Sequence, residues 1–358
     1  MTYTLLDTTK LLTERAKWAF AARRVNKVDA KRLSPAIADA RPGDLVFGRV
    51  AQIGQHKRLQ VAEGRYSTFY PGDHIVVVCG DRYAPDQFES VARINPEGAD
   101  LVAAGGICGE MLHAHGNMSK PTRIEPLGLV ADSEGEVLNV DHYALPPSAK
   151  IPSIPFIVVV GTSMNGGKTT AVASLAHGLT RSGLNVAAIK ATGTGAFGDF
   201  NAFRDAGASC VLDFTDAGMA TTYRQPIERI EDACDTLLVH AAEQGAEIAV
   251  VELADGLFQT ETRRLLEASR VRDALSGVLF AAPDAMSAVA GTAWLREIGL
   301  QPLAVSGKVS QSPLAVQEAQ GACPVRVLTR EALCDPKQAR ELIAPVLERF
   351  RPQAMRAA

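Results

Sequence analysis

The chain has 358 residues, of which 47% are hydrophobic and 22% are charged, and its formal net charge is −3. This composition is that of a folded globular protein, so it excludes a disordered chain and a strongly basic nucleic-acid-binding protein. Because the length exceeds one typical hydrophobic core, two domains are expected.

The cysteines and the N-terminal residues indicate the compartment. No two cysteines have a CxxC or zinc-ribbon spacing, which favours reduced core residues of a cytosolic protein. The first residues lack the continuous apolar core of a signal peptide, and no apolar run approaches the roughly 18 residues of a membrane span. We therefore expect a cytoplasmic protein that binds neither membrane nor nucleic acid.

The first part of the chain is predicted to be rich in β-structure. Apolar residues at helical spacing over 8–26 predict an opening helix. From 43 to 142, short β-prone pieces are separated by turn signals such as Pro71-Gly72-Asp73. Residues 1–145 are therefore predicted to form a helix followed by a small β-barrel or β-sandwich domain.

A proline-rich linker, 146–155, is predicted to separate this domain from an α/β domain over 156–358. Aliphatic strands without polar alternation then alternate with helical stretches, as a parallel sheet covered on both faces requires. The prediction is a doubly wound, mainly parallel sheet. The expected strands are 156–160, 185–190, 247–253, 276–282, 301–307 and 325–328, and the expected helices lie near 167–182, 228–244, 260–273, 286–299 and 336–349.

One loop carries the clearest chemical signal. The strand 156–160 runs into the sequence GTSMNGGKTT and then into a helix. A glycine-containing loop at a helix N-terminus surrounds a phosphate with backbone N–H groups, although an incidental glycine turn is the alternative. In such a loop Lys168 would reach the β- and γ-phosphates, and the Thr169 hydroxyl would ligate Mg²⁺. The residues predicted to bind nucleotide here are Gly161, Thr162, Asn165, Gly166, Gly167, Lys168, Thr169 and Thr170.

This loop resembles the GTxxxxGKT loop of dethiobiotin synthetase and its relatives among the deviant P-loop NTPases, a class that also holds the nitrogenase iron protein and the MinD-like ATPases. As in that family, the first glycine, Gly161, stands seven residues before Lys168. The resemblance covers 156 to about 305, and it implies a P-loop NTPase fold, ATP and Mg²⁺.

A second lysine extends the resemblance. Lys190 ends the second predicted strand and precedes Ala-Thr-Gly-Thr-Gly, which is similar to the family's KPxxSG segment. The resemblance implies that Lys190 contacts phosphate and substrate groups and that Thr194 supplies a hydroxyl. The position of Lys190 supports this role, because the C-terminal end of a parallel strand faces the ligand crevice. The alternative is a surface lysine at a strand end.

Two acidic positions are candidate metal ligands. The segment 200–206 resembles the helix that holds the family's Mg²⁺-binding aspartate. Asp205 matches that aspartate best, and Asp199 is the competing candidate. The alternative is that the aspartate is an ordinary charged residue of a helix, which would give the same pattern. The segment 250–256 resembles the family's VEGAGG, whose glutamate corresponds to Glu252 and completes the Mg²⁺ site. A carboxylate after a buried strand is costly unless it is paired or metal-bound, which favours a functional role.

Two further features are weaker signals. The polar loop 213–223 either lines a substrate pocket or simply connects two elements. The pattern Gly105-Gly106-Ile107-Cys108-Gly109 in the N-terminal domain is too common to be assigned as a site.

Together these features predict an ATP- and Mg²⁺-dependent phosphoryl-transfer enzyme, a kinase or a ligase acting through an acyl or carbamoyl phosphate. Its substrate would be a small anionic molecule, and Lys168 and Lys190 would be catalytic. Adenine is expected because no guanine-reading NKxD is present. The alternative is a regulatory or metal-delivery NTPase switch that acts on a protein partner. Relatives build their site across a dimer, so a homodimer is a reasonable expectation.

Overall fold

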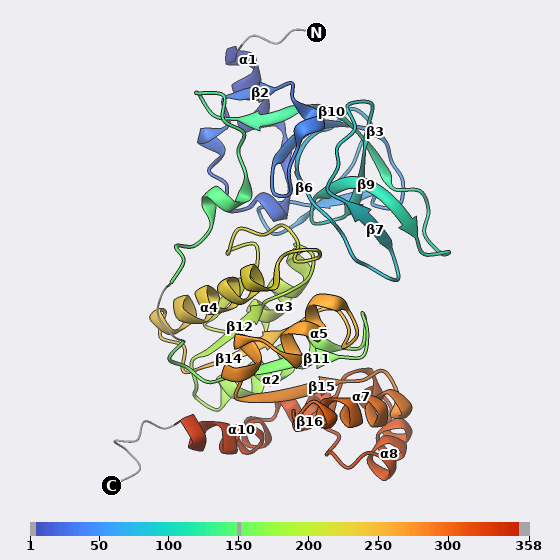
Figure 1. The fold of residues 1–358 in the computed structure, drawn as a ribbon, viewed down its shortest axis with the longest axis vertical. Coiled ribbons are helices and arrows are strands. Elements are labelled where there is room, and N and C mark those ends of the chain that lie inside the picture. Colours follow the sequence, from blue (N-terminus) through green and yellow to red (C-terminus); the bar gives the residue numbers. More distant parts are fainter. Residues whose placement is uncertain (1–4, 149–151, 351–358) are drawn as a thin grey trace. The chain divides into compact units, whose positions relative to one another are not determined.

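A computed structural model describes residues 5–148 and 152–350 (Figure 1). Its contacts divide the chain into two compact units: the first comprises 1–146, 193–197 and 214–224, and the second comprises 147–192, 198–213 and 225–358. Two short segments that follow strands of the second unit therefore belong to the first. Of the predicted linker, residues 149–151 lie outside the described parts of the chain.

The first unit does not begin with the long helix predicted over 8–26. The helix α1 (Leu5–Lys10) continues into a π-helical turn (Leu11–Arg15), and the chain is extended at Ala16, with ψ 143°. The next two residues form β1 (Lys17–Trp18), which pairs with a strand far along the chain. Trp18 is 1% exposed and its Nε1 donates to the Leu12 carbonyl at 2.8 Å. Strand pairing and burial of this indole outweigh the helical spacing of the sequence.

The core of the first unit is a closed β-barrel. Five strands pair in the circular order β6-β3-β10-β8-β9, and the ring closes because β6 also pairs with β9. This confirms the predicted β-rich domain and gives it the form of a barrel. Besides β1, the strands of the first unit, inside and outside the barrel, are β2 (Arg32–Ser34), β3 (Leu45–Gln52), β4 (Arg58–Gln60), β5 (Tyr66–Thr68), β6 (His74–Cys79), β7 (Phe88–Val91), β8 (Ala99–Ala103), β9 (Ile107–Ala114) and β10 (Thr122–Ala131). Short 3₁₀ turns are Phe20–Ala22, Lys27–Asp29, Ile37–Asp39 and Val140–Tyr143.

The second unit contains a parallel sheet of six strands in the order β13-β12-β14-β11-β15-β16. The predicted doubly wound α/β domain is confirmed, and the predicted strands from 156 to 307 agree within two residues. Residues 325–328 form no strand and share only a single bridge, between Val327 and Val305. The strands are β11 (Phe156–Gly161), β12 (Val186–Lys190), β13 (Cys210–Asp213), β14 (Ile248–Glu252), β15 (Gly277–Ala281) and β16 (Pro302–Ser306).

The helix predicted over 260–273 is two helices. Ala268 is extended, and the Ser269 side chain accepts from the Arg272 amide at 3.0 Å, which caps a new helix. None of the helices in the described ranges has the length and apolar character needed to cross a membrane. The helices are α2 (Lys168–Arg181), α3 (Phe197–Asp205), α4 (Ile227–Glu243), α5 (Thr260–Glu267), α6 (Arg270–Ala274), α7 (Ala285–Glu297), α8 (Pro313–Ala322), α9 (Arg330–Cys334) and α10 (Pro336–Phe350), with a 3₁₀ turn at Lys308–Gln311.

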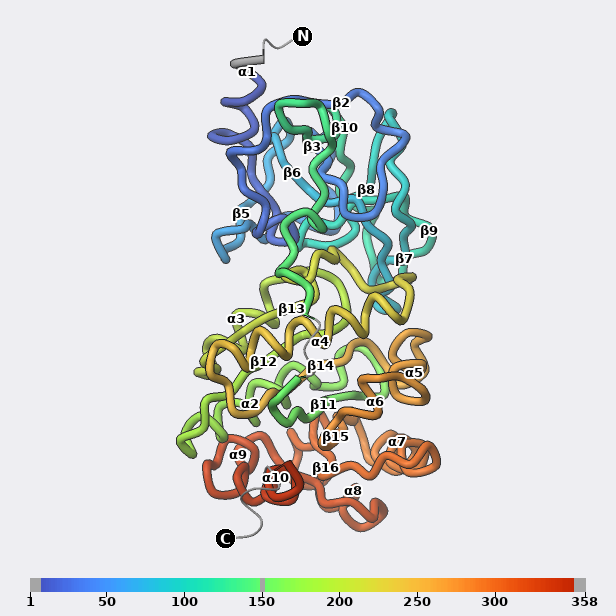
Figure 2. The backbone as a smooth tube through the Cα atoms, turned by 60° about the vertical axis from the view of Figure 1, so that its left-hand side comes forward, coloured from blue at the N-terminus to red at the C-terminus, as the bar shows by residue number. Residues whose placement is uncertain are grey.

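The strand order contains a reversal that defines the ligand edge of the sheet. The chain steps from β11 through β12 to β13 in one direction, and from β14 through β15 to β16 in the other. Helices α2, α9 and α10 lie side by side (Figure 2) and share one hydrophobic cluster on one face of the sheet. Right-handed crossovers place α4 to α7 on the other face. Ligands of such sheets bind at the carboxyl ends of the strands where the direction reverses, here between β11 and β14.

Candidate active site

The loop between β11 and α2 has the backbone of a phosphate-binding loop. Asn165 and Gly167 have positive φ angles of 61° and 101°, and Gly167 caps the N-terminus of α2. A Cβ atom on Gly167 would lie 2.8 Å from the Gly307 Cα, so a side chain does not fit there. The Lys308 amide donates to the Gly166 carbonyl at 3.1 Å. The segment after β16 thus braces the loop, which opens onto the helix N-terminus as anion binding requires.

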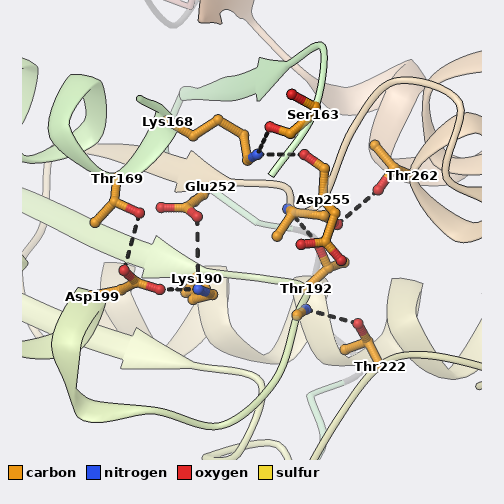
Figure 3. Close-up of polar contacts among 12 residues, drawn as sticks. Ser163, Lys168, Thr169, Lys190, Thr192, Asp199, Thr222, Glu252, Asp255 and Thr262 are labelled. Carbon is orange, nitrogen blue, oxygen red and sulfur yellow. Dashed lines mark hydrogen bonds and ion pairs between the residues drawn. The ribbon is translucent and has the colours of Figure 1, made fainter. Parts of the chain in front are cut away.

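Lys168 is held inside this loop. It is 6% exposed, and its Nζ donates to the Ser163 carbonyl at 2.9 Å and to the Asp255 carbonyl (Figure 3). Burial lowers the pKa of Lys168, while the Glu252 and Asp255 carboxylates act to raise it. The ammonium group is therefore fixed by two carbonyl oxygens beside the backbone that would cradle phosphate.

Lys190 lies at the end of β12, next to two carboxylates. Its register partner on β14 is Glu252, and Nζ lies 3.7 Å from Glu252 Oε1. It also forms an ion pair with Asp199. Burial acts to lower the pKa of Lys190, but the charges of Asp199 and Glu252 outweigh it and hold that pKa above its usual value. Lys190 therefore stays protonated.

The structure brings Asp199, rather than Asp205, to the loop. Asp199 lies in the first turn of α3, and the Thr169 hydroxyl donates to its Oδ1 at 3.0 Å. Burial opposes ionisation of Asp199, but the charge of Lys190 holds its pKa below the usual value. Asp205 lies at the last position of the same helix, is exposed, and lines a different cavity together with His177.

Glu252 has an oxygen that the protein does not satisfy. The residue is 2% exposed, and its Oε2 is buried with no hydrogen-bond partner in the residues described. Burial raises the pKa of Glu252, and the charge of Lys190 opposes this shift. An unsatisfied buried carboxylate oxygen is costly, which makes it a candidate ligand for a cation.

These residues can bind Mg²⁺ only if phosphate and water supply the remaining ligands of the ion. Among 5–148 and 152–350, no group of three or more His, Cys, Asp or Glu side chains could hold a metal ion. Mg²⁺ in nucleotide sites is typically bound by one or two carboxylates plus phosphate and water. The Thr169 hydroxyl and the two carboxylates, Asp199 and Glu252, match that donor set.

A cavity of about 330 Å³ collects most of the predicted site residues. Gly161, Thr162 and Gly166 belong to the same loop but do not line the cavity. Thr194 belongs to the first unit, where it bridges to Thr221. Sequence reasoning missed Asp255, Lys308 and Gln311 as lining residues; their signal was their position just after strands β14 and β16. The predicted residues that line the cavity are Asn165, Gly167, Lys168, Thr169, Thr170, Lys190 and Glu252, together with Asp199.

A larger cavity of about 670 Å³ adjoins the first. Gly167, Thr170 and Lys308 line both. Its other walls include Ser174 of α2 and the start of α9, residues 329–331. It lies beside the N-terminal end of α2, on the side away from Lys190, and its volume is in the range of small-molecule sites.

Comparisons with known proteins give similarity to solved structures alone: no protein-family model matches the sequence, and no curated protein matches it. One similar structure is the signal recognition particle 54 kDa protein from Aeropyrum pernix K1 in complex with GDP, 18% identical, with a TM-score of 0.37, covering 57% of this chain and 50% of that one. The receptor FtsY from Elizabethkingia anophelis in complex with GDP is 18% identical, with a TM-score of 0.34, covering 60% and 68%. FtsY from Thermotoga maritima is 16% identical, with a TM-score of 0.33, covering 56% and 72%.

The chain spans about half the length of the first of these proteins. By its loop geometry and strand order, the second unit has the fold of P-loop nucleotide-binding proteins.

Proposed function

We propose that this chain is a Mg²⁺-dependent enzyme that transfers the γ-phosphoryl group of ATP to a small anionic acceptor. It would act either as a kinase or as a ligase through an acyl or carbamoyl phosphate. The observation that carries the proposal is the unsatisfied Oε2 of Glu252, which lies in a cavity that also holds two lysines, Lys168 and Lys190. A site with two cations and a spare anionic oxygen suits a metal–triphosphate complex.

The nucleotide would bind along the loop and α2. Backbone amides of 161–170 and the N-terminal end of α2 would hold the β-phosphate, and Lys168 would contact the β- and γ-phosphates. The larger cavity, beside Gly167 and Thr170, has room for the nucleoside. We assign ATP because the chain lacks a guanine-reading NKxD.

The metal ligands in this proposal are Thr169, Asp199 and Glu252. Asp205, favoured by the sequence, is left out because it is exposed and lines a different cavity. Bound Mg²⁺ would neutralise charge on phosphate oxygens. Lys190, now paired with both carboxylates, would then be free to meet the charge of the transferring group.

The acceptor would approach from the side of Lys190 and Lys308, which both line the smaller cavity and would attract an anion. An acceptor oxygen forms the new bond to the γ-phosphorus while the bond to the bridging oxygen breaks, and ADP leaves. Catalysis here is positioning and charge stabilisation, so a kinase and an acyl-phosphate ligase would use the same residues.

A second candidate is an NTPase switch that acts on a protein partner. It is favoured by one observation: the segment 193–197, between Lys190 and Asp199, belongs to the first unit. A switch changes conformation between nucleotide states, and segments that follow the nucleotide-binding strands carry such changes. The two candidates differ in what stimulates turnover.

The test is ADP release by the full chain with ATP and Mg²⁺ in the presence of pools of small anionic metabolites. We expect at least one pool to accelerate release, and the Lys168→Ala variant to show no acceleration. If no pool accelerates release above the level of that variant, the kinase or ligase proposal is wrong. Stimulation by a protein fraction that is lost on protease treatment would favour the switch.

A further inference from the structure

We propose that Thr192 and Thr262 are positioning residues for Lys168. Their hydroxyl groups bind the backbone of Ala254, and the next residue, Asp255, supplies a carbonyl oxygen that binds the Lys168 ammonium group (Figure 3). All five residues belong to the second unit. The effect on phosphate binding rests on the proposed function, whereas the contacts that carry the inference do not.

Thr192 binds both the amide and the carbonyl of Ala254. It follows β12 and is 1% exposed. The Ala254 amide donates to its Oγ1 at 2.7 Å, and the same hydroxyl donates its own hydrogen to the Ala254 carbonyl at 2.6 Å. Ala254 is buried, so water has little access to replace this partner. Removing the hydroxyl alone would therefore leave a buried amide unsatisfied, which is costly.

Thr262 binds the same carbonyl from another element of the second unit. It is the third residue of α5 and is 1% exposed, and its hydroxyl donates to the Ala254 carbonyl at 2.7 Å. The Gln259 side chain caps α5 and accepts from the Thr262 amide at 2.9 Å, which fixes the place of Thr262. A carbonyl oxygen has two lone pairs, so two donors fix the orientation of this peptide group.

The segment 253–257, which contains Ala254, lies against the phosphate-binding loop. The Leu257 amide donates to the Gly161 carbonyl at 3.0 Å. A Cβ atom on Gly256 would lie 2.5 Å from the Thr162 carbonyl oxygen, so the two backbones approach as closely as glycine allows. A change in the conformation of 253–257 would therefore reach the loop directly.

The Asp255 carbonyl oxygen sets the position of the Lys168 ammonium group. Lys168 Nζ donates to this oxygen and to the Ser163 carbonyl. An ammonium group has three N–H donors, so one is left for a phosphate oxygen in the proposed function. If the Asp255 carbonyl moved, the long lysine side chain would gain rotamer freedom, and its amino group would become more accessible to a reagent.

The experiment compares five variants of the full chain. Thr192→Val and Thr262→Val remove a hydroxyl and keep the shape, whereas Thr192→Ser and Thr262→Ser keep the hydroxyl. Thr292→Val is the matched control, because Thr292 is also fully buried but lines neither cavity of the site. The first readout is the acetylation rate of Lys168 by acetic anhydride, measured by peptide mass spectrometry with the exposed Lys337 as internal reference. The second is the affinity for a fluorescent ATP analogue.

We expect acetylation of Lys168, relative to Lys337, to be about fivefold faster in Thr192→Val and Thr262→Val, the change that loss of a typical hydrogen bond gives. The affinity for the analogue should fall several-fold in both variants, because Lys168 must then be ordered when the phosphates bind. The two serine variants and Thr292→Val should remain near wild type in both readouts.

Unchanged acetylation in the folded valine variants would overturn the proposal, whatever the nucleotide results. Equal acceleration in the serine variants or in Thr292→Val would also overturn it, because the effect would then come from altered packing and not from the hydroxyl groups. Faster acetylation with an unchanged affinity for the analogue would show that the contacts are only structural, with the same consequence. If acetylation accelerates as expected but the wild type binds no analogue, the proposed function fails while the positioning of Lys168 stands.

Discussion

Lys190 and Glu252 occupy paired positions at the ends of two neighbouring parallel strands, and Lys190 Nζ lies 3.7 Å from Glu252 Oε1. The two side chains are 13% and 3% exposed. A buried ion pair of this kind is weak evidence for stability, because desolvation offsets much of the attraction. Removing one partner alone leaves a buried charge without compensation, and this asymmetry can be measured.

Lys190→Met should destabilise the protein by about 3 kcal/mol, because Glu252 loses its main opposing charge. The double variant Lys190→Met/Glu252→Gln should recover part of that loss, since Glu252 no longer leaves an uncompensated charge whereas Asp199 still does. Urea denaturation of the wild type, both single variants and the double variant measures the difference. A double variant less stable than Lys190→Met would show that the ion pair is not the source of the effect.

Lys168→Ala should lower the turnover of ATP by about 10²–10³-fold, because the transferred phosphate loses its main fixed cation. The backbone of the loop keeps its shape, since Asn165, Gly167 and the 307–308 segment define it. Steady-state ADP release and circular dichroism check both points. Turnover within about threefold of wild type in the folded variant would remove Lys168 from the site.

Asp199→Asn should raise the Mg²⁺ concentration needed for half-maximal turnover, because Mg²⁺ prefers an anionic oxygen. Asp205→Asn is the matched control on the same helix, and it should leave this requirement unchanged because Asp205 is exposed and contributes no wall to the smaller cavity. Mg²⁺ titrations of both variants decide between them. The reverse result would restore Asp205 as the metal ligand.

His56 should make the barrel unit sensitive to acid. Burial, with the nearby charge of Arg82, lowers the pKa of His56 from 6.5 to about 4. Below pH 6.5 the unfolded chain therefore takes up a proton that the folded chain does not, so stability falls as the pH drops from 6.5 towards 4. The loss should be about 2 kcal/mol by pH 5.

His56→Gln should remove this dependence between pH 7.5 and 5, whereas His142→Gln, at an exposed position, should keep it. Urea denaturation at the two pH values measures both. Equal acid sensitivity in wild type and His56→Gln would mean that another group titrates.

The sequence predicted five of the six strands of the second unit because they are short aliphatic runs with clear ends, whereas β13 was not predicted. Those ends placed Gly161, Lys190 and Glu252 correctly at one edge, since the carboxyl ends of parallel strands meet there. The choice between Asp199 and Asp205 depended on where α3 begins. That start is set by Gln60, 137 residues away in the chain, so no local pattern could reveal it.

The first unit was predicted less well, for a related reason. Trp18 lies in a strand because it pairs with Val76 and packs into the barrel, and both effects are tertiary. Residues 99–103 and 107–114 were not predicted as strands, although the turn between them carries Gly105 and Gly106. In a closed barrel several strand faces are fully buried, which removes the polar alternation that identifies strands in a sequence.

The first unit is assembled from three separate stretches of chain, and Ala220, from the last of them, lies in its hydrophobic core with Val76 and Ile107. Cleavage at a protease site placed at 149–151 would therefore cut the chain into two fragments, but these fragments would not correspond to the two compact units. The two products should behave as a split protein, with the C-terminal fragment supplying the missing parts of the N-terminal one. Co-expressed as separate chains, with a tag on one, they should purify together and regain the nucleotide binding of the intact chain.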